Sequence, residues 1–212
     1  WRAPATGISG PGTADLSARI ARLDVRNAHR YVPTSAGEGT LSWLQHALLD
    51  GQLTEGSVRV RGDLARFPFT TPADGEFRAA GRMRNVVLDV APATGPNGER
   101  TPGKPWPLLR DIDGELVFER QGMTFRAQRG TIGGARIADA TARIPDLTRN
   151  AALEVRGQVD GALSAILNYV NSSPVAAMIG DVTRGAEVKG AGKVDLKLDV
   201  PLAGAGAVRP SC

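Results

Sequence analysis

Residues 193–200 read Lys-Val-Asp-Leu-Lys-Leu-Asp-Val, and every second residue of this stretch is aliphatic. Successive side chains of a β-strand point to opposite faces. The aliphatic residues of this stretch therefore share one face, while its lysines and aspartates share the other. Such alternation is typical of an antiparallel strand with one dry and one solvated face.

The same period of two occurs in several other parts of the chain, and turn-forming residues separate these parts roughly every eight to fifteen residues. Regular turn signals between alternating segments indicate a meander of hairpins. The predicted strands lie at residues 21–28, 57–61, 113–119, 123–129, 153–160 and 193–200. The turn signals lie at 72–75, 91–107, 121–122, 133–134 and 145–146.

Apolar residues at helical spacing interrupt the strand pattern twice. They predict a helix over residues 40–50, ended by Gly51, and a second helix over 162–170. A further turn or two of helix is expected over 175–179, ended by Gly180.

The composition is that of a folded chain with little bulky material for a thick core. Of the 212 residues, 42% are hydrophobic and 23% are charged, but only 5% are aromatic, and there are 26 glycines and 14 prolines. Frequent turns and few large side chains favour a thin or open sheet. We therefore expect a mainly β fold, an elongated antiparallel sheet with two or three short α-helices.

The charge distribution, the cysteine content and the length of the apolar runs each exclude a class of site or segment. The net charge of +4 comes from dispersed arginines with acidic residues among them, which argues against a nucleic-acid site. The weakly basic surface suits anionic lipid headgroups. A single cysteine, Cys212, excludes an internal disulfide and a zinc site built from several thiolates. No apolar run reaches the 18 residues of a membrane span, so we expect any anchor to lie outside this segment.

Catalytic chemistry finds little support in the sequence. His29 and His46 have no acidic or cysteine partner at ligand or triad spacing, and no G-x-S-x-G motif is present. Carboxylates gather between Asp111 and Glu119, but alternation places several of them on one solvated strand face. A carbohydrate-active protein would need two carboxylates converging in a cleft. We predict a non-enzymatic protein without a cofactor or metal.

The apolar strand face admits two interpretations. In a closed sandwich it is simply the core. In an open, curved sheet it is a trough suited to acyl chains, with arginines on the back and the rim. The periodicity fits both interpretations equally.

Several phrases, in a fixed order, resemble the YhdP family of the AsmA-like superfamily. The likeness covers roughly residues 20–202. Its phrases are Tyr31-Val32-Pro33 followed by Trp43-Leu44, Gly51 ahead of the run from Gly56 to Leu64, Phe67-Pro68-Phe69, Trp106-Pro107-Leu108-Leu109 leading to Asp113-Gly114-Glu115-Leu116, Thr131-Ile132-Gly133-Gly134, Ile144-Pro145-Asp146-Leu147, Leu167-Asn168-Tyr169-Val170 with Pro174, and Val200-Pro201-Leu202.

This resemblance implies an internal piece of a Gram-negative envelope protein that is anchored in the inner membrane. It further implies a long periplasmic β-sheet, curled into a hydrophobic groove, that helps to move phospholipid towards the outer membrane. The relatives are not known as enzymes, and no catalytic residue is carried over. We expect a poorly defined stretch over residues 1–20, a β-groove segment over 20–202 and an unstructured tail over 203–212.

The resulting hypothesis is a section of a lipid-transfer groove, with phospholipid acyl chains as the ligand. Both membranes would be reached through parts outside this segment, and nucleic acid is not expected as a partner. The alternative is a structural or docking module of envelope assembly that binds no lipid. The residues predicted to line the groove are Leu116, Phe118, Met123, Phe125, Leu153, Val155, Val194, Leu196 and Leu198.

Overall fold

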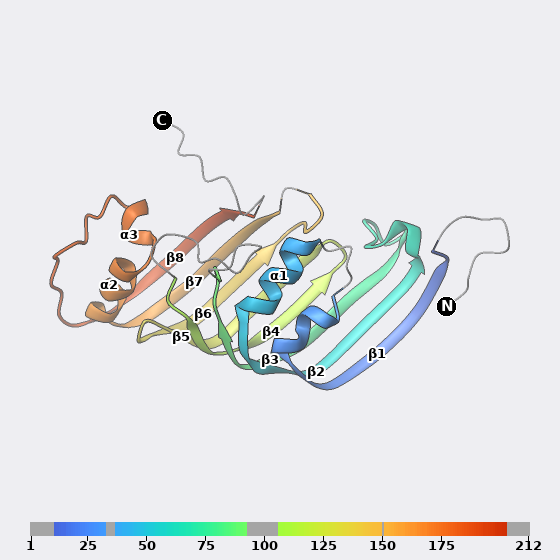
Figure 1. The fold of residues 1–212 in the computed structure, drawn as a ribbon, viewed down its shortest axis with the longest axis horizontal. Helices are drawn as coiled ribbons and strands as arrows, with labels where there is room; N and C mark the ends of the chain where they lie inside the picture. The colour runs from blue at the N-terminus through green and yellow to red at the C-terminus, as the bar shows by residue number, and fades with distance from the viewer. Residues whose placement is uncertain (1–10, 33–36, 93–105, 150, 203–212) are drawn as a thin grey trace.

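The structure, a computed structural model, describes residues 11–32, 37–92, 106–149 and 151–202. Its strands form one eight-stranded antiparallel sheet, in which each strand pairs with the next in sequence (Figure 1). The predicted meander and the mainly β fold are therefore confirmed. The strands are β1 (Thr13–Asp24), β2 (Leu48–Asp63), β3 (Gly75–Leu88), β4 (Leu109–Glu119), β5 (Gly122–Ile132), β6 (Ala135–Ile144), β7 (Ala152–Ala162) and β8 (Ala191–Pro201).

Short helical segments connect some of the strands. The 3-10 helix η1 (Val25–Arg30) and the helix α1 (Glu38–Ala47) lie between β1 and β2, and a single 3-10 turn, η3 (Leu64–Arg66), follows β2. Helices α2 (Leu163–Ser172) and α3 (Val175–Met178) lie between β7 and β8, where the sequence predicts them. Within the described ranges, no helix is long and apolar enough to cross a membrane.

Two sequence predictions near the N-terminus are wrong in detail. The strand expected over residues 21–28 ends at Asp24, whose carboxylate accepts a hydrogen bond from the backbone N–H of Arg26 at 3.0 Å and caps η1. Gly51 does not end α1 but lies inside β2, because the helix already ends at Ala47. A methyl group on Gly51 would lie 2.7 Å from the Cα of Val86, so close contact between β2 and β3 explains the glycine.

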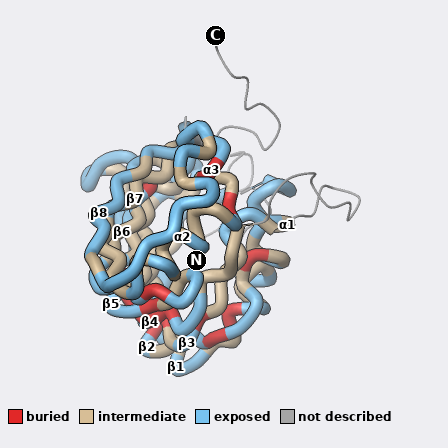
Figure 2. The backbone as a smooth tube through the Cα atoms, turned by 90° about the vertical axis from the view of Figure 1, so that its left-hand side faces the viewer, coloured by how far each residue is buried: buried red, intermediate tan, exposed pale blue. Residues whose placement is uncertain are grey.

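The long strands are bent by β-bulges. Glu55, Asn85 and Asp111 have φ angles of 52°, 49° and 52°, and each lies at a shift in the register of β2, β3 or β4. A bulge bends its strand and increases the local twist. Figures 1 and 2 show the resulting curved sheet, with α1 and η1 over one of its faces.

The main cluster of buried side chains joins η1 to the centre of the sheet. Val25 of η1 packs with Met83, Val86 and Ile112, and Leu116 and Phe125 pack against this group. η1 therefore covers the face that carries Leu116 and Phe125. Complete burial of an aliphatic side chain contributes about 1.5–3 kcal/mol, so the cluster holds the connection firmly on the sheet.

The strand ends form two unlike rims. We call helix rim the ends at Asp24, Leu48, Leu88, Leu109, Ile132, Ala135, Ala162 and Ala191. At this rim η1 follows β1, α1 precedes β2 and α2 follows β7. We call turn rim the opposite ends, at Thr13, Asp63, Gly75, Glu119, Gly122, Ile144, Ala152 and Pro201.

Candidate functional site

The strand register arranges the apolar side chains in rows that cross the sheet. Residues directly opposite each other in an antiparallel pair point to the same face. One row runs without a break over six strands from β3 to β8. Its members, in order, are Gly81, Leu116, Phe125, Ala142, Val155 and Leu198.

Two further rows flank this one on the same face. The row nearer the turn rim consists of Ala79, Phe118, Met123 and Ile144. The row nearer the helix rim consists of Met83, Gly114, Ala127, Ala140, Gly157 and Leu196. Two of the residues predicted to line the groove, Leu153 and Val194, are not members of these three rows. Leu153 pairs with Val200, and Val194 pairs with Val159.

All nine residues predicted to line a groove therefore lie on one face. Seven of them are half-buried, and Val194 and Leu196 are each 38% exposed. The small residues between them, such as Ala142 and Gly157, were not predicted. Only the register reveals them, because alanine and glycine carry little hydrophobic signal in a sequence.

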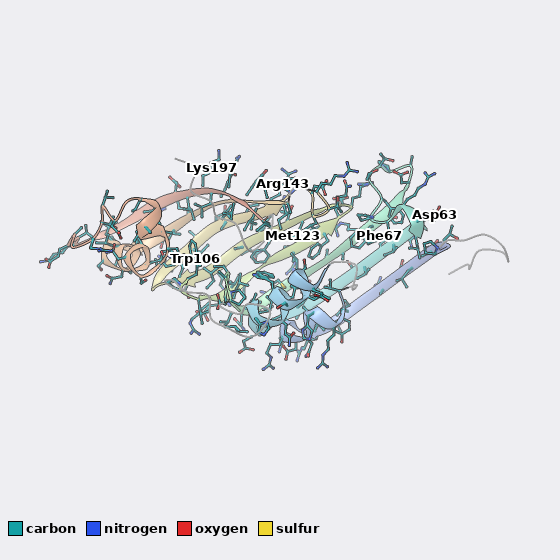
Figure 3. All side chains as sticks on the ribbon, turned by 45° about the horizontal axis from the view of Figure 1, so that its top comes forward. Asp63, Phe67, Trp106, Met123, Arg143 and Lys197 are labelled. Atoms are coloured by element: carbon teal, nitrogen blue, oxygen red, sulfur yellow. The ribbon has the colours of Figure 1, made fainter. Side chains whose placement is uncertain are left out.

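The opposite face is charged. One of its rows runs from Glu115 through Arg126, Thr141 and Arg156 to Lys197. Figure 3 labels Lys197 on β8 and Met123, a member of the apolar face, on β5. The sheet thus separates an apolar surface from a charged one along its whole width.

The apolar face is buried in the middle of the sheet and more exposed at β8. Over β3 and β4, Val25 buries Met83 and Ile112 to 8% and 4% exposure. Along β8, Val194, Leu196 and Val200 remain 38–40% exposed. The face is a core beneath η1 and an open apolar surface towards β8.

Helix α2 closes the helix rim at the far end of the sheet. A methyl group on Gly192 would lie 2.7 Å from a Cδ atom of Leu163, and one on Gly133 would lie 3.0 Å from the Cβ of Tyr169. The absence of side chains at these two glycines lets α2 approach β8 and the β5–β6 turn. Burial raises the pKa of Tyr169 to about 12.

The turn rim carries an aromatic cluster. Phe69 is buried between Gly62 and Gly75, and the Phe67 ring lies 5.7 Å from the Phe69 ring and 4.9 Å from the Phe77 ring, centroid to centroid. Phe67 is nevertheless 42% exposed, and Figure 3 shows it near Asp63 at this end of the sheet. The apolar face therefore continues to the turn rim.

The other candidate chemistry has structural explanations. The Nδ1 atoms of His29 and His46 lie 3.0 and 2.8 Å from backbone carbonyl oxygens one helical turn away. Asp113 is paired with Arg129 rather than with a second carboxylate. In the part of the chain that the structure describes, no three histidine, cysteine or acidic residues gather as metal ligands do.

The fold and this face define a class: an open antiparallel β-sheet with one apolar and one charged face. The protein-family model described as YhdP protein matches residues 2–209. The chain therefore belongs to the YhdP family. Among curated proteins, it is 26% identical over 190 residues to the intermembrane phospholipid transporter YhdP of Escherichia coli (strain K12). That alignment covers 89% of the chain but only 14% of the relative. No solved structure matches the chain significantly.

Proposed function

We propose that this chain is one section of a groove that carries phospholipids between the inner and outer membranes, with acyl chains lying on its apolar face. The observation that carries the proposal is the set of apolar rows that cross β3 to β8, one of which ends on β8 at the partly exposed Leu196. The relationship to a protein named as an intermembrane phospholipid transporter supports it.

The proposed mechanism is passive. Each methylene group of an acyl chain gains about 0.8 kcal/mol when it is shielded from water. A continuous apolar surface therefore lowers the barrier that an acyl chain meets in the aqueous periplasm, and no bond needs to form or break. The membranes at either end would be reached through parts of the longer protein outside this chain.

The alternative, a structural or docking module, is favoured by one observation. Val25 and η1 close the face over β3 and β4 as the core of an ordinary domain would. If that closure extended over the whole face, function would move to the charged face, and the chain would bind no lipid.

Lipid retention separates the two proposals. We would purify the chain from a Gram-negative host and quantify bound phospholipid by native mass spectrometry, in the wild type and in Leu196→Asp. Because Leu196 is partly exposed, we expect this variant to fold. It should retain at least about fivefold less phospholipid, since an acyl chain lying on this surface would have to remove the new carboxylate from water.

Lys197→Asp is the matched control, because it places the same new side chain one residue away on the charged face. It should retain as much phospholipid as the wild type. A wild-type chain that carries no phospholipid, and takes up none when it is added, would favour the structural module.

A further inference from the structure

β8 ends the sheet with a regular edge. In the described part of the chain only β7 pairs with it, and β8 lies at the border of the sheet (Figure 1). Its pairs with β7 run from Ala152–Pro201 to Ala162–Ala191 without a bulge. A regular edge strand offers its unpaired backbone N–H and C=O groups to another strand.

Most charged side chains of β8 lack a partner in the part of the chain that the structure describes. Lys193, Lys197 and Asp199 are exposed, and their side chains form neither an ion pair nor a hydrogen bond there. Asp195 accepts a hydrogen bond from Nε2 of Gln158 at 3.1 Å. Three of the four charges on this strand are therefore free to bind a group outside the sheet.

The neighbouring strand β7 is a poor electrostatic match for β8. Arg156 lies opposite Lys197, and Glu154 lies opposite Asp199, so like charges face each other at two successive charged positions. Like charges directly opposite one another destabilise a strand pair. The charges of β8 would be better compensated by a strand on its other side.

The order of residues from Lys193 to Asp199 is symmetric about Leu196. Consider a second copy of β8 that runs antiparallel beside the first, with a two-fold axis at Leu196. Lys193 would then face Asp199, Val194 would face Leu198 and Asp195 would face Lys197 of the second copy. Residues directly opposite each other point to the same face. Every charged residue would thus gain an opposite charge, and every aliphatic residue an aliphatic neighbour.

This complementarity depends on the register. If the axis moved by one residue, to Asp195 or to Lys197, like charges would face each other at the axis and on both sides of it. If the register slipped by a single residue, apolar side chains would face charged ones. Among these registers, only the axis at Leu196 satisfies both kinds of side chain.

We propose that two copies of the chain pair through their β8 edges and form a two-fold symmetric dimer. The two sheets join into one, and the apolar face of one copy continues into that of the other. The pairing closes after two copies, because each chain has one β8 edge. It covers neither apolar face, so the inference does not depend on phospholipid binding.

Sedimentation velocity measures this association. We expect a monomer at about 5 µM and a dimer with a dissociation constant of about 50 µM, because two edge strands bury less than the roughly 1,200 Å² of a stable interface. A chain that stays monomeric up to about 500 µM would overturn the proposal, since most of it should then be dimeric. Growth beyond a dimer would also overturn it, because it would indicate head-to-tail pairing of β8 with β1.

Charge reversal tests the register. In Lys197→Asp, the new aspartate would face Asp195 of the second copy at two symmetric positions. We therefore expect the dimer to weaken at least about tenfold. Asp195→Lys should weaken it to a similar extent, because the new lysine would face Lys197.

An equimolar mixture of these two variants separates edge pairing from an effect on folding. A Lys197→Asp chain and an Asp195→Lys chain together have opposite charges at both positions again. The mixture should therefore dimerise about as tightly as the wild type, although neither variant does so alone. A mixture that associates no more tightly than the separate variants would overturn the register.

Arg126→Asp is the matched control. Arg126 is exposed on β5, in the same row of the charged face as Lys197, and its replacement changes the net charge by the same amount. This variant should dimerise as the wild type does, and circular dichroism melting should show that all the variants are folded. Dimerisation of Lys197→Asp and Asp195→Lys that equals that of Arg126→Asp would overturn the proposal.

Discussion

Asp113 is a buried carboxylate that ties three strands together on the charged face. Its side chain is 8% exposed; Oδ1 accepts a hydrogen bond from the backbone N–H of Asn85 on β3 at 2.7 Å, and Oδ2 accepts one from Nε of Arg129 on β5, also at 2.7 Å. Burial alone would raise the pKa of Asp113, but these hydrogen bonds and the charges of Arg129 and Arg84 lower it overall. The carboxylate thus holds the bulge at Asn85 of β3 and links it to β5.

Asp113→Asn should reduce the free energy of unfolding by about 1.5–3 kcal/mol at pH 7, since it removes charge-assisted hydrogen bonds at a buried position. Urea unfolding measures this change. Asp111→Asn is the control on the same strand, because Asp111 is exposed and asparagine tolerates its positive φ angle. Equal losses in the two variants would contradict a specific role for Asp113.

The lowered pKa of Asp113 also determines how the difference in free energy of unfolding between the wild type and Asp113→Asn changes with pH. Because the pKa of Asp113 is lower in the folded state, the unfolded chain binds the proton first as the pH falls. The contribution of Asp113 is complete above the unfolded pKa of about 3.9 and is lost as the pH falls through the lower folded value. The gap between the wild type and Asp113→Asn should therefore be constant near neutrality and should narrow below about pH 4.

At the scale of the elements, strands with strong alternation were predictable and alanine-rich strands were not. β8 alternates throughout, so both its existence and its apolar face follow from the sequence. β6 contains alanine at positions 135, 138, 140 and 142, and alanine has a low preference for strands. Its presence follows only from the turn signals on either side, so its side chains were missing from the predicted site.

The covering of the apolar face by η1 could not be predicted from the sequence either. Val25 continues the alternation of Leu23, and a period of two cannot show that the chain leaves the sheet at Asp24. The carboxylate of Asp24 starts η1, and burial of Val25 then holds η1 on the sheet. Local capping and a long-range contact together override the strand pattern.

Glycines in the apolar rows maintain close contact between neighbouring side chains and strands. A methyl group on Gly114 would lie 2.7 Å from Cζ of Phe125, and closer still to the carbonyl oxygen of Arg126. Gly114→Ala should therefore reduce the free energy of unfolding by about 1–3 kcal/mol, because neither the ring nor the backbone can move freely. Urea unfolding again provides the measurement.

Gly39 in α1 is the matched control for Gly114. A methyl group there meets nothing within 4 Å, and alanine favours helices, so Gly39→Ala should be neutral or stabilising by up to about 1 kcal/mol. If the Gly114→Ala variant were as stable as the wild type, Phe125 would not be packed against β4.

At the scale of the whole molecule, the sheet is firmest near its middle. β4 has a partner on each side and contains the buried residues Ile112, Asp113 and Gly114. In the described part of the chain, β1 and β8 each pair with only one strand, and most residues of β8 are exposed. Local opening costs least where few contacts are broken.

Hydrogen exchange followed by mass spectrometry should therefore show a gradient across the sheet. We expect peptides from β4 to exchange slowest, and peptides from β1 and β8 to exchange at least about tenfold faster, because edge strands open without disturbing the centre. β7 is the internal comparison for β8, since it lies beside it and has partners on both sides. If β8 exchanged as slowly as β4 and protection increased with protein concentration, another copy of the chain would be covering that edge, because an exposed edge strand readily pairs with a second chain.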